Sequence, residues 1–107
     1  MTNFISTSST YWISDEEIQI LEKNATNGDK NSAFKLYQYH MFVSLDQDSE
    51  FKWLEIAAKN GHPIAQSNLA DLFFTQGDKE KAIFWAKKAY RNGAKLPDEL
   101  KILININ

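Results

Sequence analysis

Two histidines and one acidic cluster are the side chains in this sequence whose types could carry chemistry. His40 lies within a segment of helical periodicity, and His62 lies in the turn between Gly61 and Pro63. The chain has no cysteine, so it can form no disulfide, thiolate zinc site or cysteine nucleophile. The two histidines could act as a catalytic dyad only if the fold brought them together. We interpret His62 as an exposed turn residue, and we expect no enzyme and no catalytic residue.

The acidic cluster Asp46-x-Asp48-x-Glu50 has the spacing of the first ligands of a calcium loop. It lacks the glycine at the sixth position and the glutamate at the twelfth, where Ala57 stands. We therefore predict that these acids stabilise the N-terminus of the following helix. The four glycines are scattered singly, so no glycine-rich phosphate loop is present. We expect no metal site and no cofactor.

Composition limits the class of protein. A chain of 107 residues is about one domain. Hydrophobic residues are 43% and charged residues 24%, as in ordinary globular proteins. The formal charge of −2 gives no basic excess to indicate nucleic acid. The opening residues 1–6 lack the features of a signal peptide, and no apolar stretch reaches the ~20 residues that span a membrane. We expect a cytoplasmic protein that does not enter the membrane.

An internal repeat organises the chain. Asn-Gly pairs recur with their glycines at positions 28, 61 and 93, which are 33 and 32 residues apart. At an offset of 32, further identical residues coincide: Ala33 with Ala65, Phe42 with Phe74, Asp46 with Asp78, Trp53 with Trp85, and Ala57 with Ala89. The flanking segments have helical periodicity, so these glycines indicate left-handed C-terminal caps and not hairpin turns.

The repeat predicts an all-α fold: a short right-handed solenoid of antiparallel helix pairs, about two full repeats with capping helices. The main helices should span 31–43, 49–59, 63–75 and 79–92, with a preceding helix near 15–26 and a short closing one near 97–104. The turn at 44–49 has no glycine and must be built differently. We expect one domain over 1–107, with 1–13 a partly ordered tail.

Particular side chains should hold these elements in place. Ser14 and Glu17 have the spacing of a capping box. Trp85 and Tyr90 should fill the space between helix layers, with Trp53 equivalent to Trp85. Tyr11 and Trp12 are expected to hold the tail against the body.

One run of residues resembles a known repeat family. Phe51-x-Trp53-x-x-x-Ala57-Ala58-x-x-Gly61-x-x-x-Ala65-Gln66-x-x-Leu69-Ala70 is similar to the Sel-one-like repeat, a relative of the tetratricopeptide repeat, and so is Ala82-x-x-Trp85-x-x-x-Ala89-x-x-x-Gly93. Residues 28–93 carry the resemblance. It departs from the family at Tyr37 and Gln38 and in its shorter units. The resemblance implies a non-catalytic scaffold that binds another protein.

The partner is expected on the concave face, which the first helix of each pair should line. Counting from the marker alanines places six residues there: Lys35, Tyr39, Phe42, Ser67, Asp71 and Phe74. Aromatic anchors beside charged residues are typical of protein interfaces. The alternative is that the aromatic members of this set thicken the core.

Basic residues gather in the second half of the chain. Lys87, Lys88 and Arg91 form a secondary basic patch on the last long helix. This patch is either a solvated outer face or an electrostatic handle for an acidic partner.

Two functions fit such a scaffold. One is an immunity protein, or antitoxin, that blocks a cognate toxin, and this rests on analogy with other small scaffolds. The other is a regulatory or assembly adaptor of a larger complex. A neighbouring toxin gene would favour the first, and enzymatic activity in the purified chain would favour the less expected third class, a small enzyme. We expect a monomer.

Overall fold

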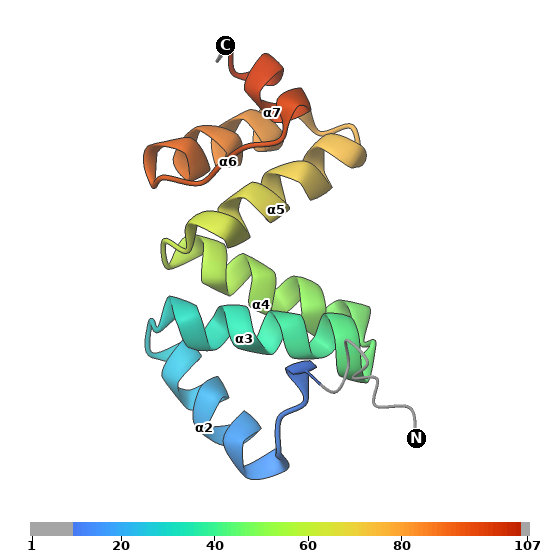
Figure 1. Cartoon of the computed structure of the whole chain (residues 1–107), viewed down its shortest axis with the longest axis vertical. Coiled ribbons are helices and arrows are strands. Elements are labelled where there is room, and N and C mark those ends of the chain that lie inside the picture. The colour runs from blue at the N-terminus through green and yellow to red at the C-terminus, as the bar shows by residue number, and fades with distance from the viewer. Residues whose placement is uncertain (1–9, 106–107) are drawn as a thin grey trace, which may run out of the picture.

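The computed structural model describes residues 10–105, which contain helices and no strand. Figure 1 shows their order along the molecule. The α-helices whose bounds lie within residues 10–105 are α2 (Asp15–Thr26), α3 (Lys30–Tyr39), α4 (Gln47–Lys59), α5 (Pro63–Thr75), α6 (Lys79–Arg91) and α7 (Asp98–Leu103), and a π-helical turn, η1 (His40–Ser44), extends α3. The predicted all-α class and the predicted helices are confirmed. The difference is at 40–44, where the expected α-helix widens into the π-helical turn.

Three of the helix junctions share one compact construction. Gly28, Gly61 and Gly77 have φ of +105°, +97° and +84°, a conformation that glycine adopts without steric cost. At the first junction the Gly28 N–H donates to the Ala25 carbonyl and the Asp29 N–H donates to the Asn24 carbonyl. This is the Schellman pattern, which satisfies carbonyls at the end of a helix. The residue after each glycine is also the N-cap of the next helix, so each reversal needs very few residues.

The junction between α3 and α4 is built without glycine, as predicted. Leu45 takes the left-handed conformation instead, with φ of 57°. Asp46 then caps α4, because its carboxylate accepts from the Ser49 N–H at 3.4 Å and from the Ser49 hydroxyl at 2.8 Å. These bonds lower the pKa of the Asp46 carboxyl. The cluster that resembles part of a calcium loop therefore contains a helix cap.

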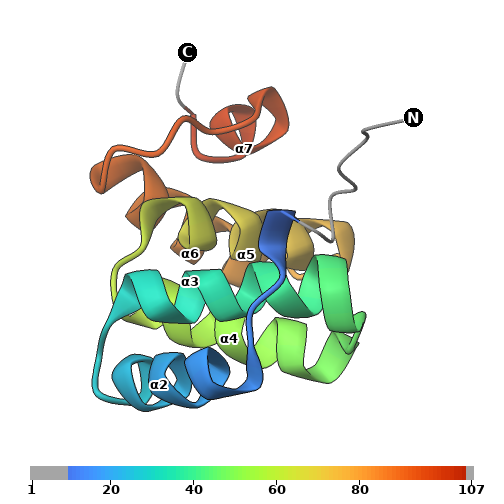
Figure 2. The same ribbon diagram turned by 60° about the horizontal axis from the view of Figure 1, so that its bottom comes forward.

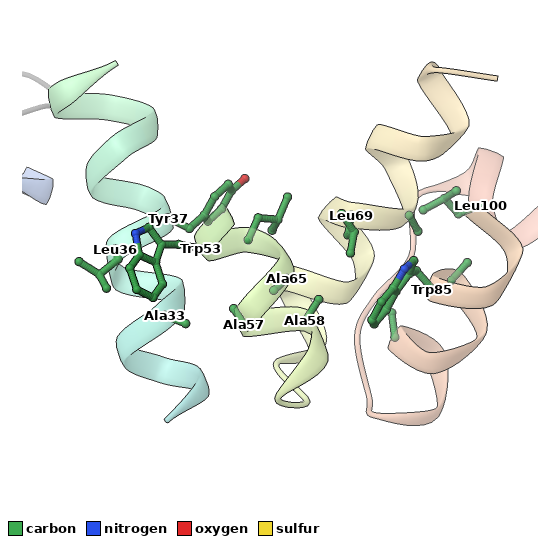
Figure 3. Close-up of a cluster of buried hydrophobic side chains, with 14 of the residues drawn as sticks. Ala33, Leu36, Tyr37, Trp53, Ala57, Ala58, Ala65, Leu69, Trp85 and Leu100 are labelled. Carbon is green, nitrogen blue, oxygen red and sulfur yellow. The ribbon is translucent and has the colours of Figure 1, made fainter. Parts of the chain in front are cut away.

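Each long helix packs mainly against its neighbours along the chain. The alanines of the sequence repeat, Ala33, Ala57, Ala65 and Ala89, are completely buried. Because they are small, they let neighbouring helices approach closely. Trp53 and Trp85 are 3% and 8% exposed and fill the space between helices (Figure 3). Their equivalent burial confirms that both are core residues.

One expectation about the last layer needs correction. Tyr90 is 49% exposed and does not fill the space between layers, because α6 is covered by α5 on one side and only by the short α7 beyond it. In α7, Leu100 is completely buried and Leu103 packs against the core, whereas Ile102 is 74% exposed. Among the described residues, no helix has the length and apolar character needed to cross a membrane.

Candidate protein-binding surface

Two hollows lie side by side on the molecule, and His62 lines both. The first has a volume of about 410 Å³ and is lined by Thr10, Tyr11, Trp12, Asn31, Phe34, Lys35, Gln38 and His62. The second has a volume of about 750 Å³ and is lined by His62, Pro63, Ile64, Ser67, Asn68, Gly93, Ala94, Lys95, Leu96 and Pro97. We call the two hollows together the groove. It runs from the segment before α2, over α3 and the start of α5, to the loop between α6 and α7.

His62 stands at the centre of the groove because it is the N-cap of α5. Its Nδ1 accepts from the Ala65 N–H at 3.2 Å. Its ring stacks on Phe34, with centroids 4.0 Å apart and planes 15° apart. Burial lowers the pKa of His62, and the positive charge of Lys30 lowers it further. His62 lies in the turn as predicted, but the expectation that it is exposed is wrong: it is half-buried, caps α5 and has an aromatic partner.

Two large apolar side chains edge the groove and remain open to solvent. Trp12 is 64% exposed and Ile64 is 54% exposed. Figure 2 shows the segment before α2 running across α3. Ile13, 2% exposed, anchors that segment, and Tyr11 stacks on Phe42 with centroids 4.7 Å apart. Tyr11 therefore packs against the body of the molecule as predicted, but Trp12 does not pack down. Of the predicted tail at 1–13, residues 1–9 lie outside the described residues.

Phe34 and Gln66 make equivalent connections in the two halves of the molecule. Each directly follows a marker alanine, Ala33 or Ala65. Phe34 reaches the turn at Gly61–His62 through its ring stack. Gln66, 2% exposed, reaches the corresponding turn through Asn92, whose Nδ2 donates to the Gln66 Oε1 at 2.9 Å. Because Phe34 lies 32 residues before Gln66, the repeat could have indicated that Phe34 contacts a helix junction. It could not have indicated that Phe34 stacks on the His62 ring.

The six residues predicted on the concave face do not converge in one hollow. Lys35 lines the first hollow, where its ammonium pairs with the Glu17 carboxylate at 3.1 Å. Ser67 lines the second hollow but is 8% exposed. Asp71 is exposed on α5 and lines neither hollow. One half of the predicted capping box is present, because the Ser14 hydroxyl accepts from the Glu17 N–H at 3.2 Å. The Glu17 carboxylate pairs with Lys35 instead of completing the box.

The three aromatic members of that set are half-buried and line neither hollow. Tyr39 contacts the edge of His40, Phe42 lies under Tyr11, and Phe74 packs against the hydrophobic core. For Phe74 the structure thus favours the core alternative. The groove is lined instead by Tyr11, Trp12 and Phe34, which were not among the aromatic residues predicted to bind.

The remaining candidates for chemistry have structural contacts. His40 Nδ1 lies 2.7 Å from the Ser44 hydroxyl within η1, and burial lowers the pKa of His40. Among residues 10–105, no three histidine or acidic side chains are grouped so that they could hold a metal ion. Of the secondary basic patch, Lys88 and Arg91 line a third hollow, and Lys87 does not.

Comparison with known proteins shows a similar sequence in Escherichia coli. It is 33% identical over 95 residues to the uncharacterized protein YibG of Escherichia coli (strain K12), in a match that covers 82% of this chain. The chain spans 62% of the length of that relative. No protein-family model matches the chain, and no solved structure matches it.

Proposed function

We propose that this chain is a non-catalytic protein-binding module of the Sel-one-like, tetratricopeptide-like kind. Its helix pairs would be α3–α4 and α5–α6, with α2 and α7 as caps. Three observations support this proposal. The glycine turns share one geometry, the paired tryptophans are equally buried, and each helix packs mainly on its neighbour in sequence. A stack of this kind exposes a broad surface that suits protein binding.

The groove is the surface on which we place the partner, and the exposure of Trp12 and Ile64 is the observation that carries the proposal. Trp12 and Ile64 edge neighbouring hollows, and more than half of each is open to solvent. Protein interfaces concentrate such aromatic and aliphatic anchors in surfaces that are hollowed and edged by polar groups. Asn31, Gln38 and Asn68 supply the polar groups here.

The test is affinity capture with the partner identified by mass spectrometry, followed by calorimetry on the purified pair. Trp12→Ala combined with Ile64→Ala should weaken binding by at least about 2 kcal/mol, roughly thirtyfold. The matched control is Ile20→Ala combined with Tyr90→Ala, because these side chains are 59% and 49% exposed and lie on α2 and α6 outside the groove. The control should bind within about twofold of the parent. Equal losses in both variants would remove the groove as the site.

The same complex separates the two kinds of binding protein. An immunity protein should form a complex of fixed stoichiometry in which the partner's toxic activity is abolished. An adaptor should leave its partner's activity intact while a third component joins the complex. Size-exclusion chromatography with light scattering, together with an activity assay of the partner, gives both readings.

A further inference from the structure

A third hollow lies at the edge of the molecule where the Asn-Gly turns gather, and its lining is strongly cationic. It has a volume of about 510 Å³ and is lined by Lys59, Asn60, Gly61, Gln66, Lys88, Arg91 and Asn92. The turn after α4 and the turn after α6 lie at the same edge of Figure 1. The lining therefore contains three cations and three side-chain amides, with no carboxylate. We call it the cationic hollow.

These cations are not needed as hydrogen-bond donors to the carbonyls at the helix ends. Carbonyls in the last turns of α4 and α6 already accept backbone hydrogen bonds, since the His62 N–H donates to Ala57 and the Ala94 N–H donates to Ala89. Arg91 does make one such bond, because its Nε donates to the Lys87 carbonyl at 3.4 Å. Its remaining guanidinium donors are unaffected by that bond.

The cations are also poorly neutralised by acids. Lys59 has a long, exposed pair with Glu55 at 3.9 Å, and such pairs contribute little. Among the described residues, neither Lys88 nor Arg91 forms an ion pair. The Lys88 ammonium instead lies over the Phe84 ring at 5.0 Å and the Trp85 ring at 5.6 Å. Trp85 is a core residue, so Lys88 has a fixed aromatic partner on one side.

A buried amide holds the walls of the hollow together. The Gln66 Nε2 donates to the Ala58 carbonyl at 3.0 Å, and its Oε1 accepts from the Asn92 Nδ2 at 2.9 Å. Gln66 is 2% exposed, and these two bonds join the end of α4 to the end of α6 through α5. The equivalent junction uses the Phe34–His62 stack. The junction between the ends of α4 and α6 is thus joined by polar side chains, whereas the equivalent junction is joined by an aromatic stack.

We propose that the cationic hollow binds an acidic peptide segment, with glutamate or aspartate carboxylates paired to Lys59, Lys88 and Arg91. Its volume exceeds that of one carboxylate and accommodates a short run of acidic side chains. The proposal rests on the protein-binding function above, and it assigns the partner a negatively charged segment that contacts a surface apart from the groove. Such complementary charges raise the association rate and weaken with salt.

The test uses the full chain and an acetylated, amidated hexaglutamate peptide in low-salt buffer. Amide chemical shifts of Asn60, Gly61 and Asn92 should move together, and calorimetry should give a salt-dependent affinity. Lys88→Gln combined with Arg91→Gln should weaken peptide binding by at least about tenfold. Lys79→Gln combined with Lys87→Gln is the matched control, because both lysines are exposed on α6, neither lines the hollow, and the change in net charge is the same. This control should bind within about twofold of the parent.

Three outcomes would overturn the proposal. One is equal weakening in the two double variants, which would mean general charge attraction. A second is chemical shifts spread over all lysine-bearing helices. The third is inorganic phosphate binding the same residues as tightly as the peptide, which would mean a small-anion site. Circular dichroism checks that each variant is folded. If the Lys88 variant loses stability, peptide binding is measured with Lys59→Gln instead, because that side chain is exposed.

The same variants distinguish this proposal from the proposed function. Loss of partner capture in the groove variant, with hexaglutamate binding intact, supports both surfaces. If hexaglutamate does not bind while the partner is still captured through the groove, only the acidic-segment proposal is refuted.

Discussion

Replacing Trp53 with alanine should be among the most destabilising single changes to this fold. The ring is 3% exposed, and a buried tryptophan removes roughly 150–250 Å² from water. Truncation to alanine loses the burial of about 150 Å² of this surface. At about 25 cal/mol per Å², this loss is about 4 kcal/mol. The ammonium of Lys52, 4.7 Å above the ring, loses its aromatic contact as well. The expected loss agrees with the roughly 3–5 kcal/mol typical of such truncations.

This loss is a large part of the total stability. A domain of this size has an unfolding free energy of roughly 5–15 kcal/mol, and a change of 1 kcal/mol moves its Tm by roughly 4–8 °C. The Trp53→Ala protein should therefore melt at least about 15 °C lower than the parent. Urea unfolding followed by circular dichroism at 222 nm measures the free energy without depending on tryptophan fluorescence.

The chain supplies its own controls for this experiment. Trp85→Ala should cost a similar amount, because Trp85 is 8% exposed at the repeat-equivalent position. Trp12→Ala should change the unfolding free energy by less than about 0.5 kcal/mol, because that ring is 64% exposed. If Trp53→Ala and Trp12→Ala unfolded at the same urea concentration, the inferred packing of Trp53 would be refuted.

The remaining predictions concern the turns. Because burial and Lys30 hold the pKa of His62 below 6.5, its contribution to stability should be complete above that pH and should fall as the pH drops below it. His62→Asn keeps a cap acceptor without titrating and should flatten this fall in urea titrations at several pH values; an unchanged slope would point to another group. Leu45→Gly should raise Tm by a few degrees, because left-handed leucine costs roughly 1–2 kcal/mol and this side chain is 72% exposed; a lower Tm in a thermal melt would show that Leu45 makes a needed contact. Gly61→Ala should cost about 1–2 kcal/mol from backbone strain alone, since its φ is +97° and an added Cβ meets nothing within 4 Å; urea unfolding measures this, and a neutral result would contradict the turn geometry.

Local physics explains why so much of the fold could be predicted from the sequence. A helix begins where an N-cap acceptor is available and ends where glycine permits the left-handed conformation. Ser14, Asp46, Gly28 and Gly61 carry those signals within a few residues of the helix that they bound. The burial of Trp53 was equally predictable, because its apolar helix face and its repeat partner both indicate the core. The widening into η1 escaped prediction, since no residue type in 40–44 specifies it.

The candidate site depended on contacts between segments that are distant in the sequence. Whether His62 is an exposed turn residue or a stacked cap is decided by Phe34, which lies on another helix. Whether Tyr90 is buried is decided by how little of α6 the short α7 covers. Trp12 edges a groove only because Ile13 and Tyr11 fix the path of the segment across α3. Helical periodicity records which face of a helix is apolar, and this was sufficient to determine the helices and their core. It does not record which neighbouring segment covers the rest, so only the tertiary structure decided where the open surface lies.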